Sequence, residues 1–229
     1  MSFIRSRILT VCAVFCCVIL LAFGTVVAQD TIAVRSNDGA VSVELPVGWI
    51  YDSLPASDVY DTVFVFADSE QLFDAAATYL STGFTGPFPP GLSGTILLID
   101  APRWRGVSSD ADEALEIVLD AAVESIQIFD EFEIDLADGN DAQVFDIFDP
   151  ALDAGGYLGG FVADNKIVVF VLLVSPDAAF TTDNSIVLET IADSIRVPGQ
   201  ADAGTEPFVP TAAVQQDRLI VTQEASVAA

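Results

Sequence analysis

Histidine is absent from all 229 residues, and the three cysteines, Cys12, Cys16 and Cys17, all lie near the N-terminus. Without histidine, the chain has no zinc–histidine site and no histidine acid, base or nucleophile relay. If the first 28 residues are removed after export, the remaining chain has no cysteine. It then has no disulfide, no thiolate metal site and no cysteine nucleophile. Most familiar catalytic arrangements are thereby excluded.

Basic residues are also scarce. Eight lysines and arginines stand against 34 aspartates and glutamates, which gives a formal charge of −26. Affinity for nucleic acid depends on basic contacts to phosphate, so this charge excludes a nucleic-acid partner of the usual kind. It keeps a protein soluble and suits cationic partners or divalent ions. The hydrophobic fraction of 52% excludes a disordered chain, because it supplies enough apolar side chain to offset the ordering entropy.

Residues 1–28 have the pattern of a secretory signal. Arg5 and Arg7 form a positive start, an apolar run follows, and Ala28 ends a small-residue exit. We therefore expect a protein that is secreted or held at the cell surface. The chain meets a membrane only if the leader is retained as an anchor, which the length of its apolar run would allow.

The remaining chain alternates between strand and helix patterns. Strands are predicted at 31–36, 40–45, 62–67, 95–99, 131–136, 142–148, 157–163 and 166–174, and helices at 69–80, 110–126 and 184–195. Residues 81–94 are predicted to form a Gly/Pro-rich loop. Because 166–174 is apolar almost throughout, we expect a central strand with both faces covered. These patterns predict one α+β domain over 29–197 and a Pro/Gly/Ala-rich, flexible tail over 198–229.

Two short motifs resemble the PsbP-like fold family. The stretch GAVSVELPVGW ends in the stop Pro46–Trp49, and the last helix ends in the sequence SIRV at Ser194–Val197. The order of helices and hairpins over about 31–197 is also similar. The family holds the photosystem II oxygen-evolving-complex protein and exported bacterial relatives, mostly without an assigned activity. The resemblance implies an α/β/α sandwich around a mainly antiparallel sheet, whereas a photosynthetic role does not follow from a fold.

Three oxygen-bearing side chains, Asp138, Asn140 and Asp141, crowd the turn between two predicted strands. Calcium prefers such oxygen ligands, although the spacing lacks the order of an EF-hand loop. Aspartate and asparagine are equally favoured in hairpin turns by their backbone preferences. Both interpretations stay open, and calcium is the only cofactor that we consider.

Arg103, Trp104 and Arg105 form a local reversal of charge sign in this acidic chain. They could bind an acidic partner or a carbohydrate. Alternatively, Trp104 covers the edge of the core while the two arginines pair with neighbouring carboxylates. A tryptophan has both an apolar body and a polar N–H, so it suits either arrangement.

The residues for catalysis are few. Serine and threonine lack a histidine base, and Lys166, the only lysine, begins a predicted strand. A pair of carboxylates can hydrolyse a glycoside, but 34 acidic residues make chance pairs common. We therefore predict an exported, non-enzymatic accessory or binding domain for an unknown protein or small-molecule partner. A cationic partner would suit the negative charge of the chain. The alternatives are a carboxylate-based extracellular hydrolase and a weak calcium-dependent adhesion module.

Overall fold

A computed structural model describes residues 30–57, 59–82, 86–100, 111–136, 139–163 and 166–198. The predicted leader over 1–28, the Arg103–Arg105 segment and the predicted tail from residue 199 onward lie outside the described residues. Within the described ranges, no helix is both long and apolar enough to cross a membrane.

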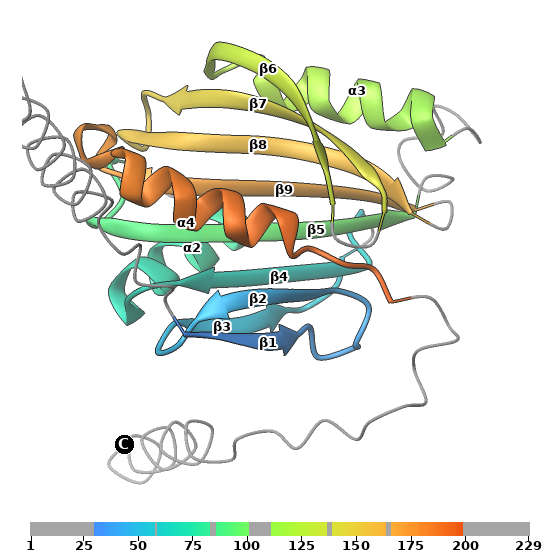
Figure 1. The fold of residues 1–229 in the computed structure, drawn as a ribbon, viewed down its shortest axis with the longest axis horizontal. Coiled ribbons are helices and arrows are strands. Elements are labelled where there is room, and N and C mark those ends of the chain that lie inside the picture. The colour runs from blue at the N-terminus through green and yellow to red at the C-terminus, as the bar shows by residue number, and fades with distance from the viewer. Residues whose placement is uncertain are drawn as a thin grey trace, which may run out of the picture. The chain divides into compact units, whose positions relative to one another are not determined.

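Most of the described strands belong to one antiparallel sheet. Their bounds are β3 Ile50–Leu54, β4 Thr62–Ala67, β5 Gly91–Asp100, β6 Gln127–Asp135, β7 Asp141–Asp149, β8 Ala154–Ala163 and β9 Lys166–Ser175. The seven strands lie in the order β3-β4-β5-β9-β8-β7-β6, and every neighbouring pair is antiparallel (Figure 1). The first predicted hairpin, β1 Thr31–Arg35 and β2 Ser42–Pro46, forms a separate two-stranded sheet.

Helices and the first hairpin cover the two faces of the large sheet. The helices are α2 Glu70–Thr82, α3 Ala111–Val123 and α4 Thr182–Asp193, with a short 3₁₀ turn, η2 Asp177–Ala179, before α4. One face packs against α2 and α3, and the other packs against α4 and the β1–β2 hairpin. In Figure 1, α4 crosses in front of the central strands. The predicted α+β class, an α/β/α sandwich around a mainly antiparallel sheet, is confirmed.

Strand β9 lies at the centre of the sheet, as its apolar run predicts. It pairs with β5 on one side and β8 on the other, and eight of its ten residues are buried. Phe170 is fully buried opposite Gly159 of β8. A Cβ atom added to Gly159 would lie 2.3 Å from the Phe170 ring. The glycine therefore leaves the space that the aromatic ring of the neighbouring strand fills.

Several strand assignments from the sequence were incomplete; β6 and β8, for example, begin at Gln127 and Ala154 rather than at 131 and 157. Strand β3 was not predicted, because every one of its residues is half-buried and it shows no apolar alternation. Strand β5 begins at Gly91, inside the segment 81–94 that was predicted to be a loop. Gly94 lies in this strand, at a position where an added Cβ atom would lie 2.3 Å from the Phe66 ring. Glycine here marks close packing between strands rather than a turn.

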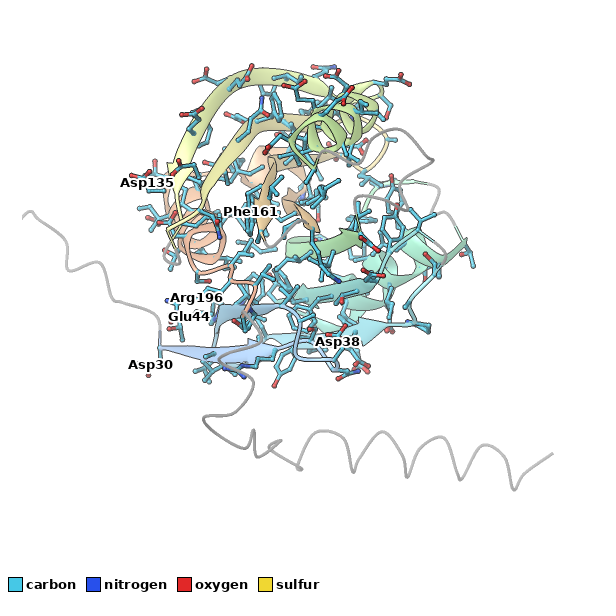
Figure 2. The ribbon with its side chains drawn as sticks, turned by 90° about the vertical axis from the view of Figure 1, so that its right-hand side faces the viewer. Asp30, Asp38, Glu44, Asp135, Phe161 and Arg196 are labelled. Carbon is cyan, nitrogen blue, oxygen red and sulfur yellow. The ribbon has the colours of Figure 1, made fainter. Side chains whose placement is uncertain are left out.

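The two motifs that carry the family resemblance have packing roles in this structure. Backbone hydrogen bonds of 2.9 Å join Ser42 and Arg196 in both directions, so the chain after α4 pairs with β2. The Ser194 hydroxyl accepts a 2.9 Å hydrogen bond from the Glu44 backbone N–H. Figure 2 shows Glu44 and Arg196 next to each other. Trp49 packs on Phe66, with ring centroids 6.1 Å apart, and thus covers part of the core.

Asp38 joins the β1–β2 turn to the large sheet. Its carboxylate accepts hydrogen bonds from the hydroxyls of Ser36 and Thr62, which are both buried, and from the Ala40 backbone N–H. Partial burial alone would raise the pKa of Asp38, but these hydrogen bonds outweigh it and lower the pKa below 3.8. The Asp38 carboxylate therefore stabilises the hairpin while it is ionised.

We expect Asp38→Ala to reduce the free energy of unfolding at pH 7 by about 1–2 kcal/mol, because it removes the acceptor of the buried Thr62 hydroxyl and the shorter of the two hydrogen bonds that the Ser36 hydroxyl donates. The wild-type contribution is present above the unfolded-chain pKa near 3.8 and is lost as pH falls through the lower folded pKa. Urea denaturation between pH 7 and pH 2 measures both effects. Asp120→Ala on the exposed side of α3 is the control, and an equal loss in the control would contradict this role for Asp38.

Candidate binding surface

The predicted calcium ligands are only partly within the described residues. Asp138 lies outside them, while Asn140 and Asp141 lie in and after the turn that joins β6 to β7. The backbone closes this turn itself, because the Leu136 N–H donates to the Asn140 carbonyl over 2.8 Å. Among the residues that the structure describes, no group of three or more acidic side chains is arranged to hold a metal ion. Calcium at this turn therefore stays a prediction.

A second group of polar side chains gathers where α4 crosses β8. The Tyr157 hydroxyl donates a 3.0 Å hydrogen bond to Glu189 Oε1. The rings of Phe132 from β6 and Phe180 each meet the Tyr157 ring edge to face, with centroids 5.9 Å apart. Burial, the hydrogen bond to Glu189 and nearby negative charge raise the pKa of Tyr157 well above its usual value. The phenol therefore stays protonated and ties the helix to the sheet.

Acidic side chains surround this aromatic contact. On the α4 side of the sheet, Asp146 of β7 is register partner of Asp130 on β6 and of Tyr157 on β8. Burial, followed by the charges of Asp130 and Asp177, raises the pKa of Asp146. Burial and the charge of Glu189 likewise raise the pKa of Asp193. At neutral pH these like charges repel one another, so the cluster opposes folding to a small extent.

We expect Asp146→Asn to stabilise the fold at pH 7 by about 0.5 kcal/mol, a value kept small because solvent screens this partly exposed side chain. The pKa of Asp146 is higher in the folded protein than in the unfolded chain. Such a carboxyl contributes its full stabilisation only below its pKa in the unfolded chain, and the contribution is lost as pH rises through its pKa in the folded protein. The advantage of the variant should therefore vanish near pH 3. Thermal unfolding at both pH values measures it, with Asp120→Asn as the control. An advantage that persists unchanged at low pH would contradict the electrostatic cause.

Strand β6 is the most exposed strand of the sheet. Seven of its nine residues are exposed, including Ile128 at 44% and Phe129 at 66% of their full exposure. Its register with β7 shifts between Ile128 and Asp130, so Phe129 has no partner residue on β7. Such an irregularity bends and twists a strand. In Figure 1, β6 forms the last strand of the sheet and curls over it.

The charged side chains of β6 divide unequally between the two faces of the sheet. Glu131, Glu133 and Asp135 share one face, opposite Phe145, Gln143 and Asp141 of β7. The other face carries Asp130, followed by the half-buried Phe132 and Ile134. Figure 2 places Asp135 at the periphery of the molecule and Phe161 in its interior. From Asp130 to Asp135, one face of β6 is thus acidic and the other is mostly apolar, and Ile128 precedes the carboxylates on the acidic face.

The sequence predicted a strand at 131–136, but it did not indicate this surface. The alternation of EFEIDL is typical of a strand with one buried face. An edge strand and an inner strand can share that pattern, because the identity of the neighbours on each side is not encoded locally. The available signal was the pair of large apolar residues Ile128 and Phe129 directly before the acidic alternation.

Comparisons with known proteins find similarity among solved structures. No family model matches the sequence, and no curated protein matches it. The solution structure of cyanobacterial PsbP (CyanoP) from Synechocystis sp. PCC 6803 is similar, with a TM-score of 0.42 and 17% sequence identity, over 76% of this chain and 96% of that chain. That structure carries the name of the family whose motifs this sequence resembles.

Proposed function

We propose that this chain is an exported, non-enzymatic accessory or binding domain, and that its partner is cationic. The observation that carries the proposal is strand β6, which exposes large apolar side chains beside a row of carboxylates. Exposed apolar groups rimmed by charge are typical of protein-interaction surfaces. The carboxylates would attract a basic partner and repel an acidic one.

The net negative charge of the described residues also favours a cationic partner. They carry three basic side chains, Arg35, Lys166 and Arg196, against 26 acidic ones. Lys166 is itself paired, because its Nζ lies 3.0 Å from Asp61 Oδ2. The field around this body is therefore negative, which accelerates encounters with positively charged molecules.

The test uses the exported full chain, immobilised and exposed to the other exported proteins of its source cells. We expect a basic protein to be retained at about 50 mM salt and released at about 500 mM, because salt screens exposed charges. A parallel assay on a panel of oligosaccharides should show no turnover. Turnover of an oligosaccharide together with no retained partner would overturn the proposal in favour of the carboxylate-based hydrolase. Separately, mass spectrometry of the exported chain tests the loss of residues 1–28.

A further inference from the structure

We propose that an extended, cationic peptide segment of the partner adds to the sheet as a strand beside β6. This inference rests on the proposed function and names the partner more closely. A terminal strand offers unpaired backbone N–H and C=O groups, and an extended peptide can bind them through the same ladder that joins strands within the sheet. Three features of β6 together point to this partner: it is a terminal strand, it has one acidic face, and it exposes apolar residues at its start.

The backbone of β6 provides the first part of the argument. Among the described strands, β6 pairs only with β7, so its other edge faces no described strand. The opposite terminal strand, β3, differs, because the first hairpin contacts it: the Asn37 backbone N–H donates to Ser53 Oγ over 2.8 Å, and Asn37 Nδ2 donates to Asp52 Oδ1 over 3.2 Å. Of the two terminal strands, β6 is therefore the one that a partner strand can reach.

The side chains of β6 provide the second part, because they define the pattern of the partner. Residues paired across two strands lie on the same face, with Cβ atoms about 5 Å apart. A strand beside β6 would meet Glu131, Glu133 and Asp135 on one face and mostly apolar side chains, after Asp130, on the other. The matching peptide carries lysine or arginine at every second position and apolar residues between them.

Charge also argues against a second copy of this chain as the occupant. Two β6 strands side by side would bring aspartates and glutamates of both copies together, and like charges opposite each other are destabilising. Acidic residues on an edge commonly serve to prevent such pairing. Prevention of pairing does not explain Phe129, however, because a 66% exposed phenylalanine at the same edge favours association. A cationic partner accounts for both the charges and the exposed ring.

The test is a titration of the full exported chain with a peptide of about ten alternating lysines and valines, which spans a strand of this length. Two control peptides are matched to it. In one, every second backbone nitrogen is methylated, which keeps the charge but removes the hydrogen bonds of a ladder. In the other, glutamate replaces lysine. We expect the methylated peptide to bind at least about tenfold more weakly and the glutamate peptide not to bind measurably.

Variants of the protein locate the contact. Glu131→Lys with Glu133→Lys reverses two charges on β6, and Glu116→Lys with Asp120→Lys makes the same charge change on the exposed side of α3. We expect the first pair to weaken the lysine–valine peptide about tenfold and the second pair less than about twofold, since screening confines the effect to nearby charges. The peptide should also slow hydrogen exchange of the backbone amides in 127–135 when it binds the wild-type chain. This measurement does not depend on the folding of any variant.

The outcomes separate this inference from the proposed function. Equal binding of the methylated peptide, equal loss in both charge variants, or unchanged hydrogen exchange in 127–135 would overturn strand addition. A dimer of the chain alone, detected by sedimentation and abolished by substitutions in β6, would overturn it in favour of a second copy. If strand addition fails in any of these ways while the full chain still retains a basic protein, the proposed function stands and only the mode of docking is wrong.

Discussion

Phe170→Ala is expected to lower the free energy of unfolding by about 3–5 kcal/mol, the usual cost of removing a fully buried aromatic ring. Phe170 lies on the central strand β9, between Ile96 of β5 and Gly159 of β8, and is 0% exposed. Because its neighbours are backbone and packed apolar side chains of three strands, they cannot collapse into the space that the ring leaves.

Thermal unfolding should show this loss as a decrease in Tm of about 10 °C, since about 1 kcal/mol shifts the Tm of a chain of this size by 2–4 °C. Phe129→Ala is the matched control, because it removes the same ring from a position that is 66% exposed. We expect the control to change the unfolding free energy by less than about 0.5 kcal/mol. Comparable losses in the two variants would show that Phe170 does not lie in the core.

Gly156→Ala is expected to be comparably destabilising, by about 3–5 kcal/mol, although it adds only one methyl group. Gly156 of β8 has a φ of +152°, and its added Cβ atom would lie 2.0 Å from the Leu172 carbonyl oxygen and 3.1 Å from the Leu173 Cα atom. Both atoms are backbone of the central strand β9. Relief would require moving β9, which is hydrogen-bonded on both sides.

Gly48→Ala separates the steric clash from the conformational strain. Gly48 has a φ of +96°, but nothing lies within 4 Å of its added Cβ atom. We expect this control to cost about 1 kcal/mol, from backbone strain alone. Urea denaturation of both variants measures the difference. If Gly156→Ala costs no more than Gly48→Ala, then β8 and β9 do not approach as closely as the structure has them.

The candidate surface could be predicted only in part. The net negative charge follows from composition, because 34 acidic residues stand against 8 basic ones. The contact between Tyr157 and Glu189 could not be predicted, since it joins residues 32 positions apart and depends on which face of the sheet α4 covers. The same holds for Asp146, whose neighbours Asp130 and Asp177 come from two other elements.

The sequence alone determined the class of the fold, through local pattern and the family-like motifs, and the central position of one strand. A short apolar run identified the strand at 62–67, and alternation identified the one at 131–136. The longer apolar run at 166–174 required cover on both faces. Tertiary structure alone decided the strand order, the extent of β5 and the presence of β3. The physical reason is that the period of apolar residues, and the face on which they lie, are properties of one segment of the chain. A terminal strand such as β6 is instead defined by having a neighbouring strand on one side only, which depends on the rest of the fold.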